Sequence, residues 1–93
     1  MKKVRILLAD DHDLFREGLA TILDAEPDFA VIGEAGDGLA VVVMARKLVP
    51  DMILMDIGMP GCNGVEATRQ IKAELPAVTI IMLTVRNEDD LLF

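Results

Sequence analysis

The sequence has little of several residue types that common binding surfaces need. It contains no Trp, no Tyr, three Phe and one Cys. So few aromatic rings give little support to stacking on bases. The single Cys62 cannot form an intrachain disulfide, so nothing in this chain depends on an oxidising compartment. No apolar run reaches the roughly 18 residues of a membrane span, and we therefore expect a cytoplasmic protein without a membrane segment.

Positive charge is also scarce. Nine Lys and Arg stand against sixteen Asp and Glu, which gives a formal net charge of −7. Binding to a phosphate backbone relies on Lys and Arg that displace counterions, so we expect no direct contact between this segment and nucleic acid. The chain has 93 residues, of which 53% are hydrophobic. These values predict one globular domain with one apolar core.

Short apolar runs alternate with amphipathic stretches along the chain. Each apolar run suits a strand buried on both faces, and each amphipathic stretch suits a helix that covers a sheet. The connections are too long for hairpins, so the pattern predicts a doubly wound α/β fold with a parallel sheet. The expected strands are 4–9, 29–35, 52–56 and 78–83, and the expected helices are 13–24, 39–48 and 65–75.

Two of the expected helices carry further information. Asp13 is a plausible N-cap for the first helix. The second helix has no polar residue between Leu39 and Ala45, and a helix that is apolar all round must be buried or covered by a partner. We therefore hypothesise that part of a set on this helix lies in a contact between chains: Leu39, Val42, Val43 and Met44.

Carboxylates and a hydroxyl follow the apolar runs. Asp10 and Asp11 follow the first strand, Asp56 ends the third, and Thr84 follows the fourth. Ligands of doubly wound sheets bind beyond the carboxyl ends of the strands, so these side chains should converge at one edge. Such residues also end strands or cap helices without further function. Three converging carboxylates repel each other, however, and Mg2+ is the cation that suits a few protein oxygens and retained water.

These residues, taken together, resemble the receiver domains of two-component response regulators. The matching motifs are Asp10 with Asp11, residues 54–60 with Gly64, and Leu83 with Thr84. Residues 11–19 are similar to the subfamily that carries a C-terminal helix-turn-helix output domain. The resemblance implies a flavodoxin-like sheet with strand order 2-1-3-4. Because the family's fifth strand, fifth helix and conserved lysine are not in this chain, it also implies that 1–93 is a receiver domain incomplete at its C-terminus.

The resemblance assigns a role to each site residue. Asp56 would accept a phosphoryl group from a sensor histidine kinase, and Thr84 would hydrogen-bond that group and act as a switch. Mg2+ would be held by the side chains of Asp11 and Asp56, by the carbonyl of Gly58 and, through water, by Asp10. The switched output would be a DNA-binding domain absent from this chain. We expect no enzyme activity beyond the domain's own phosphorylation and dephosphorylation.

Other interpretations stay open from the sequence. One is a receiver-like interaction module that is never phosphorylated. Another is an aspartate-based phosphatase, although such enzymes usually place a second acid where this chain has Gly58. His12 is expected to order the loop after the first strand. A homo-oligomer is expected either through the second helix or through strand residues 79–83, which would form an apolar sheet edge.

Overall fold

Parallel strands form the centre of the fold in the computed structural model, which describes residues 2–59 and 63–83. Within those residues the sheet has the order β2-β1-β3-β4, as the sequence predicts. The strands are β1 (Val4–Ala9), β2 (Phe29–Ala35), β3 (Met52–Asp56) and β4 (Thr79–Leu83), and the helices are α1 (Asp13–Asp24), α2 (Gly38–Leu48) and α3 (Gly64–Glu74).

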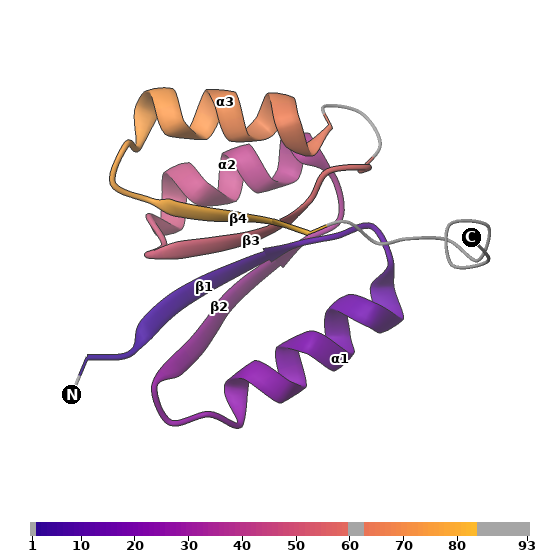
Figure 1. Cartoon of the computed structure of the whole chain (residues 1–93), viewed down its shortest axis with the longest axis vertical. Coiled ribbons are helices and arrows are strands. Elements are labelled where there is room, and N and C mark those ends of the chain that lie inside the picture. The colour runs from indigo at the N-terminus through magenta and orange to yellow at the C-terminus, as the bar shows by residue number, and fades with distance from the viewer. Residues whose placement is uncertain (1, 60–62, 84–93) are drawn as a thin grey trace, which may run out of the picture.

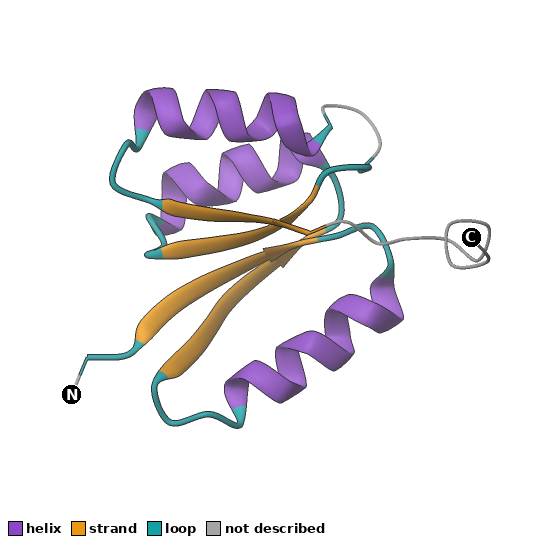
Figure 2. Cartoon of the chain, viewed as in Figure 1, coloured by secondary structure: helices purple, strands orange, loops and turns teal. Residues whose placement is uncertain are grey.

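The helices cover both faces of the sheet. Helix α1 lies on one face, whereas α2 and α3 lie side by side on the other (Figures 1 and 2). This arrangement is the doubly wound, flavodoxin-like fold that the alternating pattern predicts. The carboxyl ends of β1 and β3 point to the same end of the sheet (Figure 1).

The main apolar core lies between the sheet and the α2–α3 layer. Leu7 and Ile53 are opposite each other in neighbouring strands, and both are fully buried. The next core pair is Ala9 and Met55, again fully buried and again paired in register. Because side chains alternate between the faces of a strand, burial of these pairs fixes the register. Asp10 and Asp56 therefore leave the sheet at neighbouring positions.

Element boundaries agree with the sequence prediction to within about one residue, but the N-cap of α1 differs. Asp13 is the first helical residue, and the N-cap is His12, whose side chain makes no capping hydrogen bond. The physical reason lies in the preceding turn, where the backbone N–H of His12 donates to Asp10 Oδ1 at 2.7 Å. The carboxylate of Asp13 instead pairs with Arg16 at 3.1 Å.

Helix α2 buries more of its surface within the chain than the hypothesis of an inter-chain contact assumed. Val41, Val42 and Ala45 are buried against the sheet and α3. Val42 is therefore no longer a candidate for the contact between chains, because it is buried in the core. Leu39 and Val43 remain 63% and 47% exposed, and only these two of the apolar residues first considered stay strongly accessible.

The C-terminal end of α2 adopts a backbone conformation that its residue disfavours. Val49, the C-cap, has φ 46°, in the left-handed region. Two hydrogen bonds from Arg5 hold this end: Nη1 to the carbonyl oxygen of Val49 and Nη2 to that of Leu48, both 2.7 Å. A β-branched residue in this region is strained by roughly 1–2 kcal/mol.

None of the described helices has the length and apolar character that crossing a membrane requires.

We expect Val49→Gly to stabilise the fold. Glycine removes the left-handed strain and costs roughly 0.5–1 kcal/mol in chain entropy, so the net gain should be about 0.5 to 1 kcal/mol. Val43→Gly, within α2 and exposed, is the matched control and should destabilise because glycine is a poor helix former. Thermal unfolding of both variants measures the difference, and a lower melting temperature for Val49→Gly would contradict the strain.

Candidate functional site

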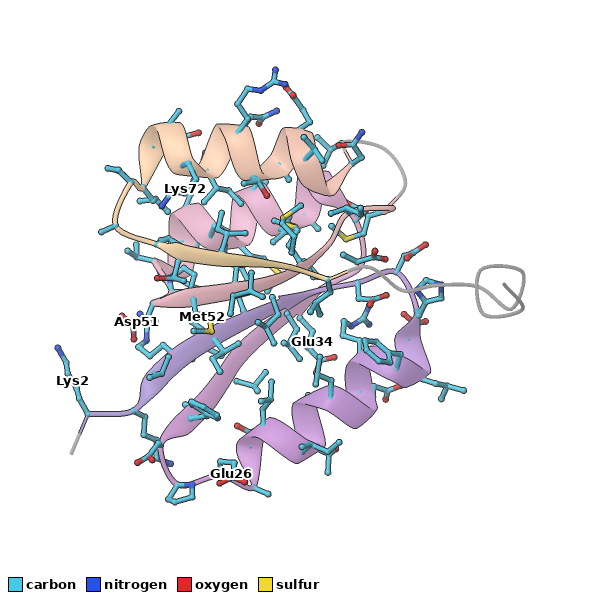
Figure 3. The ribbon with its side chains drawn as sticks, viewed as in Figure 1. Lys2, Glu26, Glu34, Asp51, Met52 and Lys72 are labelled. Carbon is cyan, nitrogen blue, oxygen red and sulfur yellow. The ribbon has the colours of Figure 1, made fainter. Side chains whose placement is uncertain are left out.

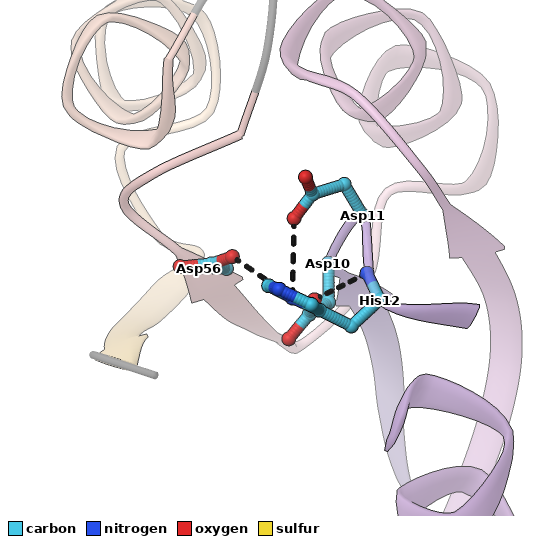
Figure 4. Close-up of side chains that lie close together, drawn as sticks. All are labelled: Asp10, Asp11, His12 and Asp56. Atoms are coloured by element: carbon cyan, nitrogen blue, oxygen red, sulfur yellow. Dashed lines mark hydrogen bonds and ion pairs between the residues drawn. The ribbon is translucent and has the colours of Figure 1, made fainter. Parts of the chain in front are cut away.

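Three carboxylates and one imidazole gather at the carboxyl ends of β1 and β3. Asp10, Asp11, His12 and Asp56 each offer a ligand atom, and these atoms lie within 4.8 Å of one another. Figure 4 shows the four side chains facing a common space. The predicted convergence of Asp10, Asp11 and Asp56 is therefore confirmed, and the strand register described above is its cause.

Asp10 is buried, yet one of its oxygens has no partner. The residue is only 3% exposed. Its Oδ1 accepts from the backbone N–H of His12 and lies 2.7 Å from His12 Nδ1. Its Oδ2 is buried without a hydrogen-bond partner among the described residues. Since a buried carboxylate oxygen without a partner costs free energy, this atom is open to a donor or cation that the described residues do not supply.

Asp56 is buried at the end of β3 and is 4% exposed. Burial is the main cause that raises the pKa of Asp56, and the negative charges of Asp10 and Asp11 raise this pKa further. A hydrogen bond from the backbone N–H of Gly58 to Oδ1, at 3.1 Å, acts in the opposite direction. The ionised form of Asp56 is therefore destabilised, and a cation nearby would relieve it.

His12 contacts the whole cluster. Its Nδ1 lies 2.7 Å from Asp10 Oδ1, 3.2 Å from Asp11 Oδ1 and 3.9 Å from Asp56 Oδ2. The hydrogen bond with Asp10 and then the charge of Asp11 raise the pKa of His12 above its ordinary value. The loop-ordering role expected from the sequence agrees with the backbone bond to Asp10. The contact of the His12 ring with the carboxylates was not predicted from the sequence. The feature that could have indicated it is the position of His12 directly after two aspartates.

Gly64, the first residue of α3, lies directly against the end of β3. The N–H of Gly64 donates to the carbonyl of Ile57 at 3.1 Å. A Cβ at position 64 would lie 2.6 Å from the Cα of Ile57 and closer still to the backbone oxygen of Asp56. Only glycine allows this approach, so Gly64 determines how the start of α3 lies against the end of β3.

Several predicted features are not described by the structure. Thr84 and Cys62 lie outside the described residues. The exposed Gly58 lies next to Asp56 and donates its N–H to it, while the use of its carbonyl as a metal ligand stays a prediction.

The donor set fits a hard divalent cation. Asp10, Asp11 and Asp56 provide carboxylate oxygens, which Mg2+ prefers, and Asp11 remains partly open to water, with its side chain 33% exposed. The observation that favours a cation is Asp10 Oδ2, which is buried and has no partner in the described part of the chain. Mg2+ bound here would be held by the carboxylates of Asp11 and Asp56, with Asp10 beside them.

A concave region lies at the opposite end of the sheet. It is a pocket of about 330 Å³ lined by two carboxylate residues and mostly apolar neighbours: Val49, Pro50, Asp51, Glu74, Leu75, Pro76, Ala77 and Val78. Its carboxylates are already engaged, because Asp51 accepts from the N–H of Arg5 and Glu74 pairs with Arg46. Figure 3 labels Asp51 at this far end, where the described residues form no comparable cluster of ligand atoms.

Comparisons with known proteins point to one family. The family model described as "Response regulator receiver domain" matches residues 6–92. The transcriptional regulatory protein LiaR of Bacillus subtilis is 53% identical over 87 residues, which cover 94% of this chain and 41% of LiaR. The response regulator protein VraR of Staphylococcus aureus is 42% identical over 86 residues, which cover 92% of this chain and 41% of VraR.

Solved structures give the same result. The response regulator domain of Thermotoga maritima CheB superposes with a TM-score of 0.84 at 41% identity, covering 89% of this chain and 61% of that chain. A LuxR-family two-component response regulator from an Aurantimonas species superposes with a TM-score of 0.85 at 35% identity, covering 98% and 66%. The chain spans about two fifths of the length of the curated relatives it matches.

We expect His12 to titrate above its ordinary pKa of 6.5 in the metal-free protein, because its protonated form contacts Asp10 and Asp11. His12 is the only histidine, so an NMR titration of imidazole shifts reads it directly. The raised pKa means that at pH 7 a larger fraction is protonated than for an isolated imidazole. Saturating Mg2+ should lower the midpoint, since it neutralises the same carboxylates.

Asp11→Asn should lower the midpoint in the metal-free protein by removing one of these charges. Glu17→Gln is the matched control, because Glu17 lies on α1 and is not among the causes of the His12 shift. A midpoint at or below 6.5 in metal-free protein, or equal effects of the two variants, would contradict the contact seen at the site.

Proposed function

Because the chain belongs to the family of response regulator receiver domains, we propose that it is a phosphoacceptor domain in which Asp56 takes a phosphoryl group from a sensor histidine kinase, with Mg2+ as cofactor. The observation that carries the proposal is the buried Asp56 within a cluster of carboxylates, one of which has a buried oxygen without a partner among the described residues.

The two oxygens of Asp56 have different surroundings. One lies toward the place of the proposed cation, and the other is held by the backbone. Oδ2 lies 3.9 Å from His12 Nδ1, within the group of side chains where a cation would be held. Oδ1 accepts the N–H of Gly58, which orients the carboxylate. In the proposed reaction, a carboxylate oxygen of Asp56 forms a bond to phosphorus while the bond from phosphorus to the kinase imidazole breaks. Bound Mg2+ would supply charge neutralisation for the phosphoryl oxygens.

The partners of the proposed function follow from the relatives. LiaR is a transcriptional regulatory protein and VraR a response regulator, and this chain matches about two fifths of each. We therefore propose that phosphorylation switches a DNA-binding output domain outside these 93 residues. With a net charge of −7, this segment would not itself bind DNA. Its catalysis would be confined to its own phosphorylation and dephosphorylation.

Treatment with a small phosphodonor such as acetyl phosphate should add one phosphoryl group in the presence of Mg2+ and none in its absence. Asp56→Asn should abolish the added mass, because the amide cannot form the acyl phosphate. Intact-mass spectrometry measures both. Asp51→Asn, the same change at the opposite end of the sheet, is the control and should retain the modification.

If the wild-type chain gains no Mg2+-dependent, acid-labile mass, the proposal fails and an interaction module that is never phosphorylated becomes the better interpretation. Retention of the full added mass by Asp56→Asn would move the acceptor to another residue.

We also propose that the chain associates with itself through apolar side chains that the monomer leaves open. Leu39 and Val43 on α2 are 63% and 47% exposed. Strand β4 lies at one edge of the sheet formed by the described residues, and Ile81 and Met82 on it are 42% and 38% exposed. Exposed apolar residues on a sheet edge favour pairing with another chain.

Val43→Glu should lower the assembly state if the α2 surface carries the contact, and Ile81→Lys should do so if the β4 edge carries it. Each change places a charge that a dry interface cannot accommodate. Light scattering at high protein concentration measures the mass. A monomeric wild-type chain would refute self-association, and Val65→Glu on the exposed face of α3 is the control for added charge.

A further inference from the structure

Arg16 on α1 makes contacts that neither the proposed reaction nor the cation cluster uses directly. Its Nη1 donates to the backbone carbonyl of Asp10 at 2.6 Å. Its Nε donates to Glu34 Oε1 on β2 at 3.0 Å, and its Nη2 lies 3.1 Å from Asp13 Oδ1. The side chain is only 16% exposed. Figure 3 labels Glu34 on the side of the sheet that faces α1.

The guanidinium joins three segments of the chain at one point. Its planar set of donors has a fixed geometry, and here it connects the end of β1, the end of β2 and the first turn of α1. Helix α1 has no buried residue, so apolar packing alone holds it weakly. Arg16 also binds Glu34 on the sheet. Its hydrogen bond therefore holds the Asp10 carbonyl in place relative to the sheet as well as to the helix.

The carbonyl that Arg16 holds lies between the two acidic ligands. The carbonyl of Asp10 and the N–H of Asp11 belong to one planar peptide unit, so fixing this oxygen fixes the direction in which the chain enters Asp11. The N–H of Asp10 is already held by the carbonyl of Ala35 at 3.0 Å, and its Oδ1 by His12. Arg16 supplies the remaining restraint on the Asp10 backbone.

We infer that Arg16 is a positioning residue for cation binding: it orients the peptide between Asp10 and Asp11 so that both carboxylates face the space shared with Asp56. This inference rests on the cation site of the proposed function. Residues that orient metal ligands typically change metal affinity by about 10- to 100-fold when they are replaced. Arg16 would act through the backbone and has no contact with the cation.

Charge and positioning predict opposite effects for loss of Arg16, which makes the inference testable. Removing one positive charge takes the net charge from −7 to −8, and electrostatics alone would then tighten binding of Mg2+. A positioning role predicts weaker binding, because Asp11 loses its fixed direction. The sign of the change in Mg2+ affinity therefore separates the two effects.

The experiment is a titration of the chain with MgCl2, followed by the amide NMR shifts of residues 10–12 and 56–58. We expect Arg16→Gln to raise the dissociation constant for Mg2+ by about tenfold or more. Arg16→Lys should recover part of the affinity, because one ammonium group can bond to the Asp10 carbonyl but cannot also span to Glu34. Dispersed spectra establish that each variant is folded. If Arg16→Gln unfolds, the dissociation constant of Arg16→Lys for Mg2+ is the test.

A control at another arginine separates positioning from charge. Arg69→Gln also removes one positive charge, from an exposed pair with Glu66 on α3. Its dissociation constant for Mg2+ should stay within twofold of the wild-type value or fall slightly.

Unchanged or tighter Mg2+ binding by Arg16→Gln, matching Arg69→Gln, overturns the role of Arg16 while the cation site stands. Absence of saturable Mg2+ shifts in the wild-type chain overturns the cation site as well.

Discussion

The parallel pairing of β1 with β3 forces negative charges together, and the local structure around them depends on that constraint. Ala9 pairs with Met55, so Asp10 and Asp56 follow at adjacent positions. Two carboxylates about 5 Å apart repel by roughly 3 kcal/mol at an effective dielectric near 20. Burial of the apolar pairs further back in the strands fixes the register, and it offsets a repulsion that would otherwise separate the strand ends.

The groups around the cluster are arranged in ways that limit this repulsion or restrain its geometry. His12 brings an ionisable nitrogen to all three carboxylates, and the N–H of Gly58 donates to Asp56. Arg16 binds the backbone of Asp10 rather than its carboxylate, which leaves the carboxylate oxygens available. One of them, Asp10 Oδ2, stays without a partner among the described residues. An oxygen without an internal partner is free to face a cation, which prefers carboxylate oxygens as ligands.

Much of this arrangement could be predicted from the sequence because the strands are short, apolar and ended by charge. The bounds of β1 and β2 agree with the prediction, and the strand-end aspartates meet as expected. Asp13 was assigned as a cap because the residue type favours it, but the turn made by Asp10 and His12 puts His12 at the N-cap and Asp13 in the first turn of the helix. Val42 was one of four candidates for a contact between chains because α2 is apolar all round, and it is buried in the core instead.

The sequence by itself determined the alternation of strands and helices and the acidic residues at the strand ends, since both depend on short-range patterns of burial and charge. Only the tertiary structure decided which atoms are paired. It brings Arg16 to the Asp10 carbonyl, Gly64 against the backbone of Asp56, and His12 among three carboxylates. These contacts join elements whose relative placement depends on sheet register and helix packing, and no local pattern in the chain encodes a distance between such elements.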